Sequence, residues 1–365
     1  MFSMQLPLQI PKSRRRLSAV VGVVAMAIAL AGCATSTAPS SAPASDTASV
    51  TAPIAGRPLP AAVSPEHIKI AIIGYSNNPF FVNVKAGSDA ANAVLESYNA
   101  SVEWVDAGAN IDVPTVNTAV QSAGSQGYAG IGFFIAGEGN CPIIETLTAK
   151  NIQIGVYNSS IPCAETSGAV ISYSQASFEA GKNSAAELLK GLDGKAGEVG
   201  IITNLFSSPS NEQRRLGFIE GLKGSNVTTV GDGLEAHDSA SETATAAESY
   251  MQSTPDLVAI YCTAGGPFGA AQAVKSAGKS AEIKVIGYDI TAENIAALED
   301  GSLYGVTGQD AFGQAYNVAI TLFNAAVTGE KPALVNVAAD APFVTLENLA
   351  KHDPRALPLG TAGTS

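Results

Sequence analysis

The chain has 365 residues and a formal net charge of −12 at pH 7. A chain of this length can bury a large core and allows roughly two domains. The charge changes to −16 once the four cations of residues 12–16 are removed. Because no basic stripe remains, the composition argues against nucleic-acid binding by phosphate neutralisation and suits an exported protein.

The first 32 residues are typical of an export signal. The four cations precede an unbroken run of small and apolar residues at 17–31, which form the charged and hydrophobic regions of a signal peptide. This run is too short for a permanent membrane helix of about 20 residues. It ends in Leu-Ala-Gly before Cys33, which resembles the lipobox of bacterial lipoproteins. The resemblance implies a lipid anchor on Cys33 that holds the protein on the outer face of a membrane; the alternative is an ordinary signal peptide and a free cysteine.

Residues 33–66 are predicted to form a disordered tether. They are mostly Ala, Ser, Thr and Pro, with almost no bulky apolar side chain. Such a segment cannot bury enough surface to fold, and its prolines keep it extended. An O-glycosylated stalk stays open as an interpretation of the same composition.

Apolar runs then alternate with helical patterns to about residue 330. The strand-like runs lie at 68–73, 101–106, 129–135, 152–157, 198–203, 227–230, 257–261 and 283–288. Alternating strands and helices predict parallel sheets with helices on both faces. Since this many strands exceed the usual size of one twisted open sheet, the sequence predicts an α/β fold of two lobes.

The first strand-like run leads into a helix through Asn-Asn-Pro-Phe-Phe at residues 77–81. Ligands of open α/β sheets bind outside the carboxyl ends of the strands, so Asn78, Phe80 and Phe81 are candidates for recognition. Asn78 could instead cap the helix, and the two adjacent rings cannot both face the same core. The motif resembles the opening of the periplasmic sugar-binding proteins related to ribose-binding protein. That family implies an asparagine on sugar hydroxyls and two rings that sandwich the sugar.

The resemblance covers residues 68 to about 349 and implies a type I periplasmic binding protein. Two Rossmann-like lobes with parallel sheets would be joined by a three-stranded hinge. The N-terminal lobe would comprise residues 67–172 and 310–338. The C-terminal lobe would comprise residues 173–309 and 339–350, and residues 351–365 would form a tail.

Three further positions match motifs of this family. Arg214 lies in an Arg-x-x-Gly-Phe pattern, which assigns it to the ligand, and its forked donors suit adjacent hydroxyls or a carboxylate. Asp289 follows an apolar strand and would accept two sugar hydroxyls, unless it caps the helix expected near Thr291. Gln309 lies beside the expected hinge, where the family places an amide on the ligand.

Other positions depart from the family pattern. Asn158 and Ser159 stand where ribose-binding relatives have Asp-Arg, and Ala264 stands where they have Asn. We keep Asn158 as a candidate ligand residue. His237 aligns with a family aromatic and could bind the ligand or lie in solvent. These changes are compatible with the fold of the family, but because they alter ligand-binding positions, the family resemblance does not identify the sugar.

The cysteines are expected to have different roles. Cys141 and Cys163 both follow strand ends that the topology would make neighbours. In an exported protein, a disulfide between them is favoured over two free thiols. Cys262 is left over and is predicted to be a buried thiol.

The sequence offers little for catalysis. His67, His237 and His352 are the only histidines and are scattered, and no metal-ligand, phosphate-loop or nucleophile motif is present. We predict no metal site, no cofactor and no enzymatic activity. An enzyme stays open as an alternative, because carboxylates can converge in space without a sequence trace.

The preferred hypothesis is a monomeric, lipid-anchored substrate-binding protein of a sugar-type ABC importer. It would close on one small monosaccharide or polyol and then dock on a membrane permease. Alternatives are a sensor that presents its closed form to a kinase or chemoreceptor, and an exported glycoside-acting enzyme. A regulator of the lactose-repressor type is disfavoured by the export signal. The ligand could be inositol, a hexose, a pentose, a furanose or a sugar acid.

Overall fold

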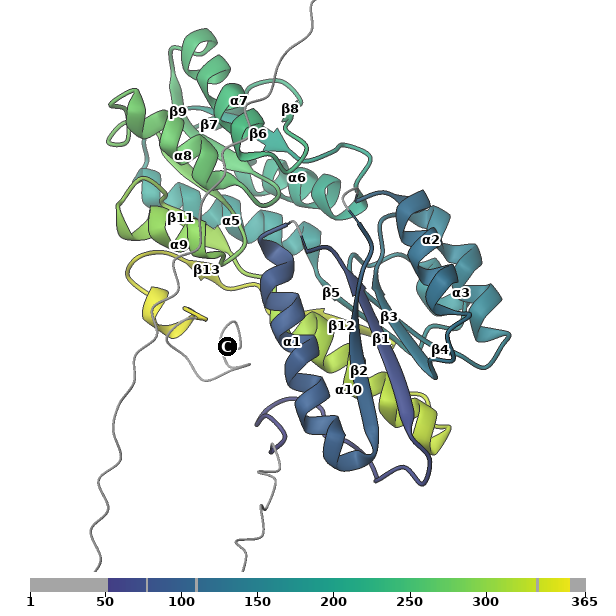
Figure 1. Cartoon of the computed structure of the whole chain (residues 1–365). Helices are drawn as coiled ribbons and strands as arrows, with labels where there is room; N and C mark the ends of the chain where they lie inside the picture. Colours follow the sequence, from purple (N-terminus) through teal and green to yellow (C-terminus); the bar gives the residue numbers. More distant parts are fainter. Residues whose placement is uncertain (1–51, 77, 109–110, 333–334, 355–365) are drawn as a thin grey trace, which may run out of the picture. The chain divides into compact units, whose positions relative to one another are not determined.

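The structure is a computed structural model that describes residues 52–76, 78–108, 111–332 and 335–354 (Figure 1). The predicted signal peptide and Cys33 lie outside these residues. Among the described helices, none combines the length and hydrophobicity that crossing a bilayer requires.

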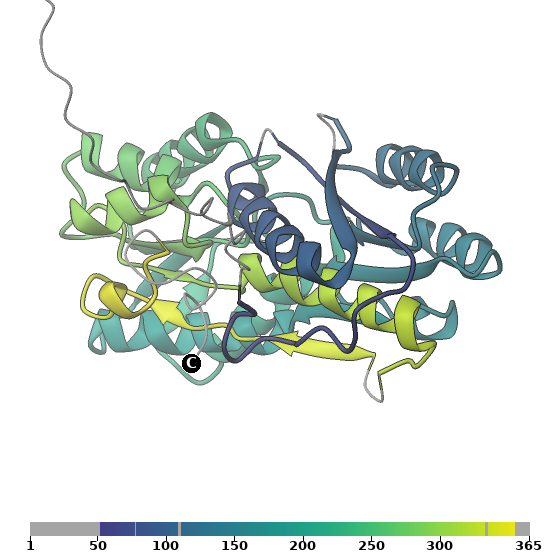
Figure 2. The same ribbon diagram turned by 60° about the horizontal axis from the view of Figure 1, so that its bottom comes forward.

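The N-terminal lobe is built on a six-stranded sheet in which all pairs are parallel. The strand order is β12–β5–β4–β3–β1–β2. The strands are β1 (Ile68–Gly74), β2 (Ala100–Asp106), β3 (Gly130–Phe134), β4 (Gln153–Asn158), β5 (Ile171–Gln175) and β12 (Asn336–Ala339). The helices are α1 (Phe80–Leu95), η1 (Glu96–Tyr98), α2 (Val113–Ala123), η2 (Glu138–Asn140), α3 (Cys141–Thr148), α4 (Cys163–Thr166) and α10 (Ala311–Thr328). Helices α1 and α10 pack together on one face of the sheet, and α2 and α3 cover the other (Figures 1 and 2).

The C-terminal lobe is built on a second sheet of seven strands. Its order is β13–β11–β10–β9–β6–β7, with β8 beside β6, and only the β11–β13 pair is antiparallel. The strands are β6 (Gly197–Thr203), β7 (Val227–Thr229), β8 (Leu234–Glu235), β9 (Leu257–Cys262), β10 (Lys284–Tyr288), β11 (Gly305–Thr307) and β13 (Phe343–Val344). The helices are α5 (Ser177–Leu192), α6 (Pro209–Leu222), α7 (Ala240–Ser253), α8 (Pro267–Ser276), α9 (Ala292–Glu299) and η3 (Leu349–Lys351).

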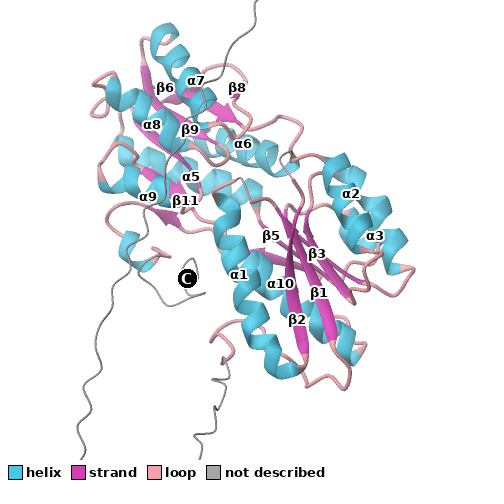
Figure 3. Cartoon of the chain, viewed as in Figure 1, coloured by secondary structure: helices cyan, strands magenta, loops and turns pink. Residues whose placement is uncertain are grey.

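Both faces of this second sheet are buried. On β9, Ile260 packs into the core beneath α7, α8 and α9, whereas the next residue, Tyr261, packs into the core beneath α5 and α6. Successive residues of a strand point to opposite faces, so a strand covered on both sides is apolar throughout. This explains why the sequence of β9 is a continuous apolar run. Figure 3 shows the helices flanking the sheets.

The chain crosses between the two sheets three times, after β5, after β11 and after β12. We expected the first crossing near residues 170–173, with the C-terminal lobe beginning at residue 173. Strand β5 instead continues to Gln175, because Tyr173 and Gln175 pair in register with Val337 and Ala339 of β12. Residues 173–175 therefore belong to the N-terminal lobe.

The last part of the predicted tether is packed against the N-terminal lobe. Arg57 is buried and forms an ion pair with Asp310. The side chain of Asn324 on α10 accepts from the backbone of Ala61, at 2.8 Å, and donates to the carbonyl of Leu59, at 2.9 Å. Figure 2 shows this segment running beside α10. The predicted disorder is wrong here, because a few polar contacts order a segment that has little apolar bulk.

Candidate ligand-binding site

A cavity of about 270 Å³ lies at the carboxyl ends of strands from both sheets. Its volume is just below the range of roughly 300–1,000 Å³ that ligand pockets occupy, which suits one small molecule. The described lining includes seven of the eight residues predicted to bind ligand: Asn78, Phe80, Phe81, Asn158, Arg214, Asp289 and Gln309.

Close helix packing positions Arg214 from the C-terminal lobe. A Cβ at Gly217 on α6 would collide with the backbone carbonyl of Phe178 on α5, and a Cβ at Gly181 on α5 would collide with the carbonyl of Arg214. Glycine at both positions therefore lets the two helix backbones touch. This contact holds the middle of α6, and with it Arg214, in place beside the cavity.

The guanidinium of Arg214 is fixed in orientation and is only 3% exposed as a residue. Its Nη2 donates to Gln309 Oε1 at 2.8 Å, its Nη1 to the carbonyl of Thr263 at 3.0 Å, and its Nε to Gln175 Oε1 at 3.2 Å. It also lies 4.1 Å from the ring centre of Tyr288, a favourable cation–π contact. These protein contacts therefore hold the charge in a fixed position at the cavity.

Asp289 is buried beside this cation but is not bonded to it directly. Gln309 lies between them, because its Oε1 accepts from Arg214 and its Nε2 donates to Asp289 Oδ1. Burial raises the pKa of Asp289, while Arg214 and Gln309 oppose that rise. The cap of α9 is Thr291, which accepts from the backbone of Asn294. Asp289 is therefore not needed as a cap.

Asn158 brings the N-terminal lobe into the same network. It ends β4 and donates from Nδ2 to Gln309 Oε1 at 3.4 Å. Gln309 follows β11 in one of the three connections between the lobes. One amide oxygen on a connection thus accepts hydrogen bonds from both lobes.

The aromatic pair differs from the expected sandwich. The rings of Phe80 and Phe81 contact each other at right angles, with centres 5.1 Å apart, and Phe81 also meets Phe134 edge to face at 5.7 Å. No ligand fits between two rings in contact. They form a single apolar wall of the cavity, and both are buried.

Asn78 contributes to the helix start and to a contact between the lobes. Its Oδ1 accepts from the backbone of Phe80 at 3.0 Å, as expected for a residue that satisfies a free helix donor. Its Nδ2 donates to Asp238 Oδ2 in the C-terminal lobe at 3.3 Å. Asn78 therefore bonds the first residue of α1, whose cap position is Pro79, and also lines the cavity.

His237 does not line the cavity. Its side chain is 56% exposed and its Nδ1 bonds Glu242 at 2.7 Å, a contact that raises the pKa of His237. Both His237 and Asp238 have left-handed backbone angles, with φ of 43° and 55°. In this turn the side chain of Asp238, and not that of His237, reaches the cavity. Asp238 lines the cavity in place of the predicted histidine.

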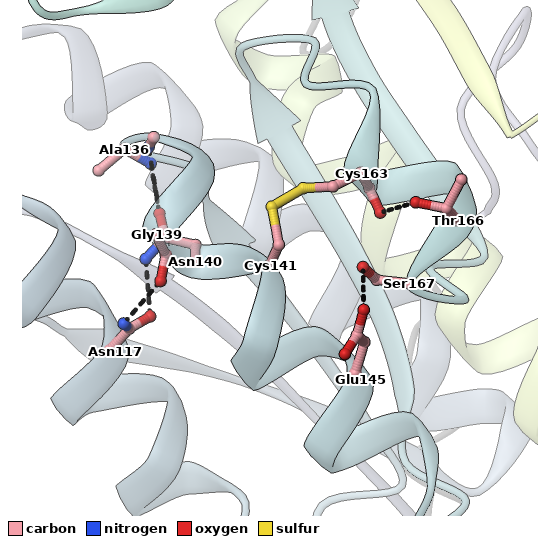
Figure 4. The surroundings of a disulfide bond; sticks show 10 residues. Asn117, Ala136, Gly139, Asn140, Cys141, Glu145, Cys163, Thr166 and Ser167 are labelled. Carbon is pink, nitrogen blue, oxygen red and sulfur yellow. Dashed lines mark hydrogen bonds between the residues drawn. A yellow bond between two sulfur atoms is a disulfide. The ribbon is translucent and has the colours of Figure 1, made fainter.

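The loop after β3 forms another part of the cavity wall and is held by a local network (Figure 4). Asn140 accepts from the backbone of Ala136 at 2.8 Å and donates to Asn117 Oδ1 at 2.7 Å. The next residue, Cys141, forms a disulfide with Cys163, with Cα atoms 6.0 Å apart. The disulfide joins the starts of α3 and α4 within the N-terminal lobe.

Sequence reasoning missed Asp238 and Gln175 as parts of this site. Gln175 holds Arg214 and donates to the carbonyl of Gly308 at 2.7 Å. It is the last residue of β5, and the position of a polar residue at a strand end was the available signal. In the described ranges, no group of three or more His, Cys, Asp or Glu side chains could hold a metal ion.

The periplasmic binding protein domain family matches residues 70–331 of the chain. The chain belongs to this family. The sequence of this periplasmic binding protein is 29% identical, over 131 aligned residues, to that of the D-allose-binding periplasmic protein of Escherichia coli K12. That match covers 36% of this chain and 42% of the relative, so it spans less than half of the relative's length.

Solved structures of similar fold agree with this assignment. A glucose-galactose binding protein from Geobacillus stearothermophilus superposes with a TM-score of 0.68 at 22% identity, covering 78% of this chain and 99% of that one. A solute-binding protein from Burkholderia graminis in complex with D-arabinose gives 0.69 at 20% identity, covering 78% and 97%. The predicted type I periplasmic binding protein fold is confirmed.

Proposed function

We propose that this protein binds one small monosaccharide or polyol in the interlobe cavity and serves as the extracytoplasmic substrate-binding component of a sugar-type ABC importer. The observation that carries the proposal is the chain of contacts from Asn158 and Arg214 through Gln309 to Asp289. It presents amide, guanidinium and carboxylate groups to the same cavity that Phe80 and Phe81 line with apolar rings. Hydroxyls and the apolar face of a sugar ring require that combination.

The proposed mechanism is closure of the two lobes around the ligand. A ligand that bonds Asn158 on one lobe and Asp289 on the other makes its full set of contacts only when the lobes are together. It therefore shifts the equilibrium toward the closed form by its differential affinity for the two forms. The closed form would dock on a membrane permease.

The proposed location is outside the cytoplasmic membrane. The family and its sugar-binding relatives support an extracytoplasmic protein, and the lipobox-like sequence before Cys33 supports a lipid anchor. We propose that the anchored protein is a monomer. Metabolic labelling with a palmitate analogue tests the anchor: label is expected on the wild type and should disappear in Cys33→Ala. Equal labelling of both proteins would reject it.

A thermal-shift screen of monosaccharides and polyols tests the binding function. A ligand at 100 times its dissociation constant adds about 2.7 kcal/mol to the free energy of unfolding. A specific hit should be lost in Arg214→Lys and in Asp289→Asn. Arg215→Ala is the matched control, because Arg215 pairs with Glu212 on the same helix at 2.8 Å and does not line the cavity. A hit that survives both cavity variants would contradict the proposed site.

The same preparation tests the absence of catalysis. Incubation of the hit and its aryl glycosides with the wild type should release no product, although three carboxylates line the cavity. Product release that is abolished in Asp289→Asn would favour a glycoside-acting enzyme instead.

A further inference from the structure

Two carboxylates from different loops converge on one side of the cavity. Asp238 follows β8 and Asp289 follows β10. A Cβ placed on Gly265 would lie 3.2 Å from Asp289 Oδ2 and 3.9 Å from Asp238 Oδ1. Gly265 and the neighbouring Ala264 line the cavity without a long side chain, so nothing from this loop separates the two oxygens.

Both oxygens that approach Gly265 lack a charged partner. Asp238 uses Oδ2 to accept from Asn78, and its inaccessible Oδ1 has no hydrogen-bond partner among the described residues. Asp289 uses Oδ1 to accept from Gln309, and its residue exposure is 5%. Neither acid belongs to an ion pair in the described part of the chain.

The charge of the cavity wall is negative. The charged residues of the described lining are Asp112, Asp238 and Asp289 against Arg214. All three kinds of nitrogen of Arg214 already donate to protein oxygens, and its charge reaches Asp289 only through Gln309. Burying a carboxylate without a compensating cation is costly, so positive charge brought into the cavity by a ligand would offset this cost.

We propose that the ligand carries a protonated amine, as an amino sugar or an amino polyol does, and that Asp238 together with Asp289 selects it. The inference rests on the proposed function and names its substrate class. An ammonium has three donors and can bond the carboxylates of Asp238 and Asp289 at once, whereas a hydroxyl has a single proton to donate. Charge-assisted bonds of this kind are about twice as strong as neutral ones.

Two observations favour this ligand class over its rivals. Burial and the charge of Asp289 raise the pKa of Asp238 to about 7, against the effects of Asn78 and Arg214, so the pair already favours an added positive charge. A sugar acid would bring a further negative charge to a wall that holds three carboxylates. A metal ion is disfavoured because only two carboxylates converge on Gly265, and no larger ligand group exists in the described ranges.

Calorimetric titration of matched pairs tests the inference. The probes are D-glucosamine with D-glucose, D-galactosamine with D-galactose, and 1-amino-1-deoxysorbitol with sorbitol, all at pH 7. In the pair whose ring or chain fits the cavity, the amine is expected to bind about tenfold or more tightly than its hydroxyl counterpart. The ratio of the two affinities should fall by about tenfold in Asp238→Asn. Glu242→Gln, which removes an exposed carboxylate four residues further along the chain, should leave the ratio unchanged.

The outcomes distinguish a failure of this inference from a failure of the proposed sugar binding. Neutral probes that bind as tightly as the amines, or an amine preference that persists in Asp238→Asn, would overturn the inference and leave sugar binding intact. If no probe of either set binds, the inference is overturned, and the wider thermal-shift screen decides the binding function separately.

Discussion

Arg57 and Asp310 form a buried ion pair between the segment that precedes β1 and the connection that precedes α10. Their side chains are 3% and 2% exposed. The same carboxylate accepts from Tyr173 at 2.7 Å and caps α10 through the backbone of Gly313 at 3.1 Å. Because Asp310 follows Gln309 directly, the N-terminal segment is fastened beside the ligand-binding network.

Removal of Arg57 should destabilise the protein strongly. Arg57→Ala leaves the carboxylate of Asp310 buried without its cation, a change that typically costs about 3–5 kcal/mol. Urea unfolding measures the loss. The control is Lys85→Ala, which removes the exposed pair with Asp89 and should cost no more than about 1 kcal/mol. Equal, small losses in both variants would mean that the N-terminal segment is not part of the folded unit.

The sequence predicted the strands well because both sheets are covered on both faces. An apolar run such as that of β9 can only be a buried strand or helix segment, and the Gly-Gly-Pro that follows it ends the run. The residues Arg214, Asp289 and Gln309 were predicted from their match to the family's motifs, and all three line the cavity. For these three residues, the local sequence motif and the position in the folded protein lead to the same assignment.

The missed features depend on contacts that no local pattern records. Arg57 meets Asp310 across 253 positions of sequence, and its neighbours have the composition of a disordered segment. Asp238 faces the cavity because two consecutive residues have left-handed backbone angles, which places it where His237 was expected. Sequence alone indicated that this loop reaches the site, but not which side chain enters it.

A methyl group at Gly217 should weaken ligand binding from outside the cavity. Gly217→Ala forces α6 away from the carbonyl of Phe178, and Arg214 moves with the helix. Overpacking of this kind typically costs about 1–3 kcal/mol of stability, and the affinity for ligand should fall in parallel. Titration calorimetry and thermal unfolding measure the two effects. Glu220→Ala, on the same helix, loses only an exposed pair with Lys223 and should bind ligand normally; similar affinities in both variants would refute the role of the helix contact.

Reduction of the disulfide should destabilise the N-terminal lobe. Cys141 and Cys163 are 22 positions apart, and closing a loop of that length contributes about 3 kcal/mol in the chain-entropy model. A reducing agent should therefore lower the melting temperature of the wild type and have no effect on the double variant Cys141→Ser, Cys163→Ser. Cys262, a buried free thiol, should not react with a thiol reagent in the native protein. A melting temperature that reductant does not change would contradict the contribution of the disulfide.

The stability of the ligand-free protein should depend on pH through Asp238. Its pKa in the folded protein is raised to about 7 by burial and by Asp289, whereas an unfolded chain has an aspartate pKa of about 3.9. The folded state therefore holds this proton more tightly, and the associated stability is present below pH 4 and is lost as the pH rises through 7. Asp238→Asn cannot ionise, so its free energy of unfolding should rise relative to wild type between pH 5 and pH 8, by at most about 1.4 kcal/mol per pH unit. His237, whose pKa is raised by its contact with Glu242, is present in both proteins, so its effect cancels in the difference. A stability difference that is constant over this range would show that Asp238 ionises normally, with its charge already compensated in the folded protein.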